Sequence, residues 1–546
     1  MTATTVTDSA KGYQGTEKLL WGIVLAVVTF WLFAGTAGTV APNIQTDINA
    51  GGGNLDASSL NLAVSITGLF SGLFMVLFGG LADRIGRVKI SLIGVALNIL
   101  GSLLLVLATG GLALPLLLTG RILQGLAAAC IMPATMALVK AYWDGKGRQR
   151  AVSMWSIGSW GGSGLAALFG GAMIRFTPVG WRAIFIASII ISIIAFLMIL
   201  GTPENKVQNA RKGFDIVGLI LFIIGTLGLM IVLLYGAQLG WLSPIVLVLA
   251  VVTIVAYAAF IRVEKGKEGP FIDFKLFKNT TFTGATISNF MLNGTIGMLI
   301  VSQQLIQLAG CRVERDAAGI CPPGGAYSPW DAGLLTLGYG VFIIAFIRVG
   351  EKLLQKFGPR KPMIWGSVIV IVACLLLMMT HVLIGQYAVL AAIAYCLFGL
   401  GLAFYATPST DAALANLPAD QAGSGAGIYK MASSLGGAIG TAISLAVFTG
   451  LSGADYQMLG NVIEMQGAQT NVSLRLAGMA ALGVNLVFLL LAIISITVTV
   501  PKQTGPITPT PQPTPDAIAE AGFVECPTCH GEGYVKRSDL AGSSAG

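Results

Sequence analysis

Apolar segments of about 20 residues recur along the whole chain and are separated by short polar loops. A run of this length is what one helix needs to cross the hydrocarbon core of a bilayer. Backbone groups in lipid must bond within their own segment, so each run is expected to be helical. The fold class predicted is therefore an all-α polytopic protein of the lipid bilayer. Fourteen transmembrane segments are predicted, at about residues 18–41, 59–82, 88–108, 112–139, 150–175, 181–201, 214–235, 243–262, 281–308, 329–349, 361–381, 386–409, 421–450 and 476–499.

The composition excludes most soluble classes. Only 10% of the residues are charged and 55% are hydrophobic, whereas a soluble domain carries about 25% charged residues. No nucleophile–base–acid grouping and no phosphate loop is found, and His381 is the only histidine before the C-terminal tail. We therefore predict neither an enzyme nor a bound cofactor. The net charge of +8 requires no nucleic-acid partner if the basic residues share one membrane face.

Basic residues concentrate in alternate loops. Together with the two tails, these loops hold 25 of the 32 lysines and arginines. The positive-inside rule assigns such loops to the cytoplasm. We therefore predict a multi-pass protein of the cell membrane with both termini cytoplasmic. No cleavable signal peptide is expected, since the first 17 residues are polar and the following apolar run is long enough to remain in the membrane.

Two loose echoes indicate an internal repeat. The loop around Gly86 aligns with the loop around Gly358 at an offset of 272, and Pro133 aligns with Pro408 at an offset of 275. Repeats of this kind place a substrate site at their interface near the membrane midplane. The predicted parts are an N-terminal tail at 1–17, a six-helix half at 18–201, two inserted helices at 202–280, a second six-helix half at 281–500, and a Pro/Thr-rich linker with a cytoplasmic tail at 501–546.

Several strings resemble one transporter family. The run Gly-x-Leu-Ala-Asp-Arg-x-Gly-Arg at 79–87 resembles the signature loop of the major facilitator superfamily, and Arg121-x-x-Gln124-Gly is similar to its second motif. The fourteen segments resemble the 14-helix drug:proton antiporters. Longer strings similar to Nor-type quinolone and multidrug efflux pumps of Gram-positive bacteria stand at 30–34, 155–164, 405–411 and 427–433.

This resemblance implies the major facilitator fold and a function. It implies export of small amphipathic compounds by alternating access, with the proton as coupling ion and a monomer as the working unit. Two alternatives stay open. One is an exporter or importer of a single endogenous anionic metabolite on the same fold, and the other is a membrane-anchored regulatory or assembly protein whose tail is the active part.

The signature loop is the predicted gate. Asp83 lies at the expected cytoplasmic end of its helix, next to Arg84, Gly86 and Arg87. A carboxylate there can accept charge-assisted hydrogen bonds from arginine and from a neighbouring helix end. Bonds made in only one state of the cycle would form a gate. The alternative is a plain topology anchor.

Charged residues inside predicted spans are the next candidates, because such charges are costly in a membrane. Arg121 shares a helix face with Gln124, and either ties down backbone carbonyls or serves the substrate or proton pathway. Lys430 lies deep in its segment, either in a cavity or in a structural pair, for which Asp411 is the nearest acid. Asp411 is also the preferred coupling acid, with Asp331 second.

Segment 281–308 carries four amides in two pairs. Asn289 and Asn293 are spaced i,i+4, as are Gln303 and Gln307, so each pair shares a helix face. Amides facing lipid would be costly. We predict that they line the cavity, and the alternative is hydrogen bonding between helices.

The charged residues inside the predicted spans also indicate the kind of substrate. The spans contain two deep cations, Arg121 and Lys430, but no comparably central acid, and none stands between Lys18 and Val40 in the first span. Low dielectric strengthens the attraction of such a cavity for an anion. We predict a bias toward substrates that bear a carboxylate.

Two groups of cysteines lie outside the spans. Cys311 and Cys321 flank a polar segment predicted to be extracytoplasmic, where oxidising conditions favour a disulfide between them. Cys526, Cys529 and His530 in the tail resemble one repeat of the chaperone-type zinc module. A structural zinc ion takes four ligands, so this half-site would need another subunit or partner. A flexible remnant is the preferred interpretation, and no metal is expected.

Overall fold

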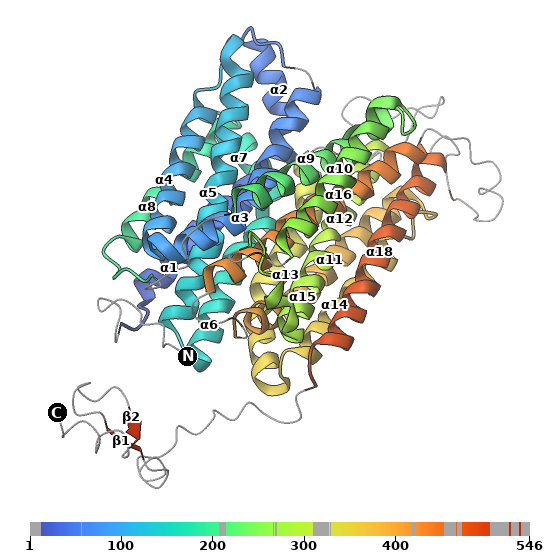
Figure 1. The fold of residues 1–546 in the computed structure, drawn as a ribbon. Helices are drawn as coiled ribbons and strands as arrows, with labels where there is room; N and C mark the ends of the chain where they lie inside the picture. The colour runs from blue at the N-terminus through green and yellow to red at the C-terminus, as the bar shows by residue number, and fades with distance from the viewer. Residues whose placement is uncertain are drawn as a thin grey trace, which may run out of the picture. The chain divides into compact units, whose positions relative to one another are not determined.

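The computed structural model describes residues 13–55, 57–206, 215–265, 267, 270–309, 327, 329–415, 417, 422–452, 466, 472–502, 523–525 and 534–536. The chain divides into two units, 1–504 and 505–546. The first is a bundle of helices (Figure 1). In the second, two short strands pair antiparallel, with Val524 opposite Val535.

The elements follow one another in chain order (Figure 1). They are α1 (Glu17–Thr39), α2 (Ala41–Ala50), α3 (Ala57–Ile85), α4 (Arg87–Val106), η2 (Gly110–Leu112), α5 (Ala113–Tyr142), α6 (Gly145–Ser156), η3 (Ile157–Gly161), α7 (Gly162–Phe176), α8 (Arg182–Ile199), α9 (Ile216–Leu239), α10 (Pro244–Glu264), η4 (Phe274–Lys278), α11 (Thr280–Gly294), α12 (Ile296–Ala309), α13 (Pro329–Phe357), α14 (Arg360–Leu377), α15 (Ile384–Ala415), α16 (Ala422–Ser452), α18 (Val472–Thr499), β1 (Phe523–Glu525) and β2 (Tyr534–Lys536).

Helix forms in every predicted apolar segment. In the described part of the chain, twelve helices are long and apolar enough to cross a membrane, or thirteen if one bent pair is a single span. The total of fourteen spans therefore stays a prediction. Two segments are divided: residues 150–175 become α6, the π-helical turn η3 and α7, and residues 281–308 become α11 and α12.

Both echoes of the repeat have matching local structure. Gly86 between α3 and α4 and Gly358 between α13 and α14 both have positive φ, of 135° and 71°. This is a conformation that glycine adopts without steric cost. Pro133 lies inside α5, as Pro408 lies inside α15. The repeated strings thus mark equivalent corners and equivalent long helices.

The halves pack mainly within themselves and meet along two helix pairs. In the N-terminal half α5 packs on α3 and α4, and in the C-terminal half α15 packs on α13 and α14. Contacts between the halves run chiefly along α3 with α16 and along α7 with α13. The inserted helices α9 and α10 pack on each other, and α9 also contacts α16. The outward side chains of α10 are apolar and exposed, as lipid contact requires.

Glycine permits close approach where α16 crosses α11. A Cβ at Gly436 would overlap the carbonyl oxygen of Phe290, and a Cβ at Gly440 would overlap the backbone of Gly294. Small residues four apart let membrane helices approach to backbone contact. The small-xxx-small pair at 436 and 440 therefore packs helices, as its spacing indicates.

Candidate functional site

The hydrogen bonds that charged side chains of the described residues form between the halves gather at one end of the bundle. We call it the basic end and define it by the corners at 84–89, 140–150 and 348–361, which carry the clustered lysines and arginines. It is the end that the sequence predicts to be cytoplasmic.

The carboxylate of Asp83 joins the two halves at the basic end. Its side chain is buried, and it accepts hydrogen bonds from Arg87 Nη2 at 2.8 Å and Nε at 3.0 Å. It also accepts the backbone N–H groups of Gly423 at 2.9 Å and Ser424 at 3.1 Å. These donors form the first turn of α16, where the helix dipole favours an anion. The geometry is the one predicted for a gate, and the gating itself stays a prediction.

The rest of the signature loop fixes the start of α4. A Cβ at Gly86 would overlap the carboxylate of Glu204, which accepts the N–H groups of Val88 at 2.9 Å and Lys89 at 3.0 Å. The Arg87 Nη1 donates to Asn205 Oδ1 at 2.5 Å. This part of the loop anchors the corner within the N-terminal half.

Two further cations of the N-terminal half hold the end of α15. Lys140 Nζ donates to the carbonyl oxygens of Leu414, at 2.8 Å, and Leu417. Arg148 Nε donates to Asp411 Oδ1 at 3.1 Å. A cation at a helix C-terminus is favourable for the same reason as an anion at an N-terminus. Together with Asp83, these contacts close the basic end.

A narrow cavity lies between the halves, and eight residues line it. They are Trp31, Ser159, Trp160, Ser163, Asn293, Ile296, Lys430 and Ser433. The space among these side chains is too narrow for a water-sized sphere, whereas sites that hold drug-sized ligands measure roughly 300–1,000 Å³. Such a ligand would therefore require the halves to part. The π-helical turn η3 supplies Ser159 and Trp160 to the wall, and such turns occur frequently at functional sites.

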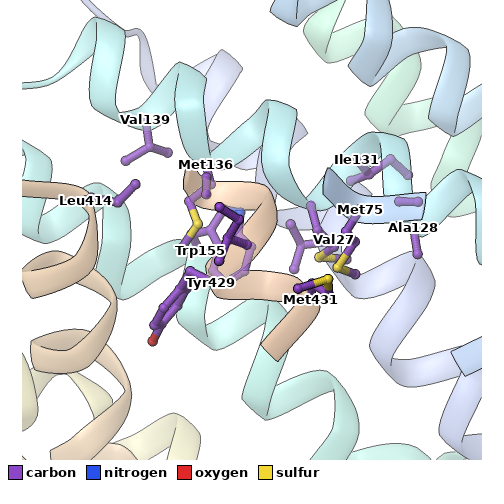
Figure 2. Packing of buried hydrophobic residues seen from close by; sticks show 14 of the residues in the cluster. Val27, Met75, Ala128, Ile131, Met136, Val139, Trp155, Leu414, Tyr429 and Met431 are labelled. Atoms are coloured by element: carbon purple, nitrogen blue, oxygen red, sulfur yellow. The ribbon is translucent and has the colours of Figure 1, made fainter. Parts of the chain in front are cut away.

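Lys430 is the cation of this cavity. It is 1% exposed, and its Nζ lies 4.2 Å from the centre of the Trp155 ring and 5.4 Å from that of Tyr429. Figure 2 shows Trp155 and Tyr429 where the halves pack together. Trp155 Nε1–H donates to Thr135 Oγ1 at 3.0 Å, which fixes the ring. Lys430 forms no ion pair with any described residue, and Asp411, its candidate partner, pairs with Arg148 instead.

The four amides of segment 281–308 have different surroundings. Asn293 lines the cavity, whereas Asn289 donates to Tyr429 O at 3.0 Å and to Ser433 Oγ at 2.6 Å. Asn289 therefore joins α11 to α16, as the helix–helix alternative proposes. Gln303 is half-buried, and the side chain of Gln307 lies outside the described residues.

Arg121 and Gln124 lie inside the N-terminal half. Arg121 is buried and donates through Nε to Ala63 O at 3.1 Å and through Nη1 to Gln124 Oε1 at 3.0 Å. Gln124 Nε2 donates to Ser102 Oγ at 3.0 Å. Neither residue is among those that line the cavity. These contacts support the structural alternative, in which Arg121 ties α5 to a backbone carbonyl of α3.

A known protein family matches most of the bundle. The family described as Major Facilitator Superfamily matches residues 22–441. The chain belongs to this superfamily. It is therefore a multi-pass membrane transporter and not an enzyme, as the sequence predicts.

Individual relatives agree with this assignment. The chain is 47% identical over 497 residues to the quinolone resistance protein NorB of Staphylococcus aureus strain MRSA252, which covers 91% of this chain and 98% of that protein. The same protein of strain MSSA476 matches over the same share.

Solved structures show the fold. The proton:xylose symporter XylE bound to 6-bromo-6-deoxy-D-glucose matches with a TM-score of 0.59 and 14% identity, over 90% of this chain and 96% of that one. The human organic anion transporter MFSD10 matches with a TM-score of 0.53 and 14% identity, over 87% and 98%. The helical bundle is thus a major facilitator fold.

Part of the site was not predicted from the sequence. No cavity role was predicted for residues 155–164, although Ser159, Trp160 and Ser163 line the cavity and the Trp155 ring contacts Lys430. Serines and tryptophans mixed with glycines within one membrane span were the available signal. The predicted Cys311–Cys321 disulfide and the tail residues Cys526, Cys529 and His530 lie outside the described residues.

Changing Asp83 to Asn should loosen the basic end. The amide keeps the size but loses the charge that Arg87 and the α16 donors stabilise, and a hydrogen bond to a charged group contributes about 1.5–3 kcal/mol. In a cysteine-free background carrying Ser424→Cys, a water-soluble maleimide should label residue 424 on the order of tenfold faster in the variant. Ser424→Cys alone is the control, since its backbone N–H still binds Asp83. Equal labelling rates would show that this contact does not hold the end closed.

Proposed function

We propose that this transporter exports small amphipathic compounds, quinolones among them, and that the proton gradient drives it by alternating access. The observation that carries the proposal is the 47% identity, over 91% of the chain, to proteins named for quinolone resistance. A fold with contacts closed at one end and a cavity between the halves supports alternating access.

The basic end is proposed to face the cytoplasm. The clustered basic residues, 25 of 32, favour this orientation, and both termini would then be cytoplasmic. The structure then represents the state in which the cytoplasmic side is closed. Return to the cytoplasm-open state requires that the contacts of Asp83, Lys140 and Arg148 across the interface break.

The cavity chemistry favours a planar substrate with an acidic group. Trp31 and Trp160 offer aromatic faces, and Asn293 and Ser433 offer hydrogen bonds. Lys430 supplies a positive charge, while none of the eight lining residues is acidic. A buried ammonium without a carboxylate partner favours an anion from the ligand. We propose a carboxylate as the group it binds.

The same observation favours a second candidate. Lys430 would also attract a single endogenous anionic metabolite, so an exporter or importer of such a compound is the alternative. The range of compounds transported distinguishes the two candidate functions, because a metabolite transporter would discriminate between quinolones and unrelated dyes.

Transport by purified protein in proteoliposomes tests the proposal. With an imposed pH gradient, vesicles should accumulate several quinolones and lipophilic dyes, and collapsing the gradient with a protonophore should abolish accumulation. Transport of only one acid in the panel would support the second candidate. No gradient-dependent movement of any compound would contradict proton-driven export.

A further inference from the structure

Proton coupling needs an acid, and the cavity lining provides none. Five acidic side chains of the described residues are buried: Asp83, Asp215, Glu264, Glu351 and Asp411. Asp215 and Glu264 lie at the base of the inserted helices, and Glu351 pairs with Arg348 on its own helix. Asp83 is held by Arg87 and two backbone N–H groups. Among these five described acids, only Asp411 forms an ion pair with a cation of the opposite half.

We propose that Asp411 carries the coupling proton, and that its ion pair with Arg148 is the contact between the halves that protonation breaks. This inference rests on the proposed proton-driven export. Asp411 would thus have two roles: its ion pair with Arg148 holds the basic end closed, and its carboxylate carries the proton.

The surroundings of Asp411 suit this role. The Asp411 side chain is 8% exposed, whereas the Arg148 side chain is 21% exposed. Lys140 binds the carbonyl oxygen of Leu414 about one turn further along α15. Besides α6, the helices α11, α12, α13, α14 and α16 pack on α15, and none of them supplies a described ion-pair partner for Asp411. Protonation of Asp411 would remove its negative charge. The cations Arg148 and Lys140 would then lie near a neutral carboxylic acid.

A series of buried hydroxyl groups links α11, α15 and α16. The Tyr429 hydroxyl is 3.0 Å from Ser409 Oγ and 3.2 Å from Thr410 Oγ1. Ser409 Oγ donates to the Tyr405 hydroxyl at 3.1 Å, which lies 2.7 Å from Ser288 Oγ. Tyr429 precedes the cavity residue Lys430, and Thr410 precedes Asp411. Hydroxyls both donate and accept, and this series reaches the residues that neighbour Lys430 and Asp411 in the chain.

In each cycle the proton binds Asp411 from one side of the membrane and leaves it on the other. With the basic end closed, a proton from the opposite side binds a carboxylate oxygen of Asp411, and the ion pair to Arg148 is lost. The basic end then opens and substrate enters from the cytoplasm. The O–H bond breaks and the proton leaves to the cytoplasm. The restored carboxylate binds Arg148 again, which closes the basic end behind the substrate.

Asp411→Asn tests the assignment, because the amide resembles the protonated acid and cannot release a proton. In detergent with a pH-sensitive dye, adding norfloxacin should release protons from the wild type and none from the variant. Norfloxacin binding, followed by tryptophan fluorescence, should persist, while gradient-driven accumulation should be lost. The matched control is Asp144→Asn, an exposed carboxylate four residues before Arg148, which should keep proton release.

A second measurement requires no substrate. Spin labels at Lys146→Cys and Lys352→Cys, exposed positions on α6 and α13, report the opening of the basic end. Their separation should increase as the pH falls in the wild type, but should stay large at every pH in Asp411→Asn and in Arg148→Gln. Distances in Asp411→Asn that still depend on pH as in the wild type, or retained gradient-driven accumulation, would overturn the inference. If the wild type exports nothing, the proposed function fails, and the pH dependence of this distance still decides on Asp411.

Discussion

Replacing Gly436 with leucine should prevent the C-terminal half from packing. A side chain there would overlap the carbonyl oxygen of Phe290 on α11, and backbone cannot move aside as a flexible side chain can. Overpacking in a close-packed interior costs about 1–3 kcal/mol and sometimes more. We expect little monodisperse protein on size exclusion and a clearly lower melting temperature for what remains.

Gly450→Leu is the matched control on the same helix. It lies within α16, and a Cβ there meets nothing within 4 Å. Its leucine variant should behave like the wild type. If Gly436→Leu were as stable as this control, the close contact between α11 and α16 would be wrong.

Removing the charge of Lys430 should separate acidic from neutral substrates. Lys430→Met keeps an unbranched side chain but removes the ammonium, so binding of a carboxylate substrate should weaken by on the order of 1–3 kcal/mol, the cost of leaving a buried polar group without its partner. This corresponds to roughly 5–150-fold in affinity. A quinolone and its methyl ester form a matched substrate pair, and the ester should be affected much less.

Lys356→Met serves as the control for this prediction. Lys356 also lies over an aromatic ring, 5.2 Å from that of Phe357, but at the exposed surface of the basic end. It should change neither substrate. If Lys430→Met folds normally and loses acid and ester equally, Lys430 serves the structure or the coupling machinery instead.

Local features of the fold could be predicted from the sequence. Apolar runs give helices because lipid leaves the backbone no other partner. The role of Asp83 also follows from local chemistry, since a carboxylate beside Arg87 at a helix end attracts backbone donors. The break between α11 and α12 was not predicted, because segment 281–308 is long enough for one uninterrupted span, although Asn293-Gly294 at the end of α11 is a turn signal.

Contacts between residues far apart in the chain could not be predicted from the sequence. Asp411 and Arg148 are 263 positions apart, and several cations were available to Asp411 in the basic loops. The ring that receives Lys430 belongs to Trp155 in the other half. Asn289 and Asn293 share a helix face, yet one joins helices and the other lines the cavity. Only the packing of the two halves decides between these outcomes.

The contact of Asp83 with α16 is made to main-chain N–H groups. Any residue except proline supplies such a donor. Ser424 can therefore be replaced by most other residues without loss of this hydrogen bond. Gly423 cannot, because a Cβ there would crowd the carboxylate itself. Natural selection can therefore tune this contact almost only through residues of the N-terminal half. Genetic suppressors of a damaged Asp83 should accordingly accumulate around α3 and α4, and rarely among the side chains of the first turn of α16.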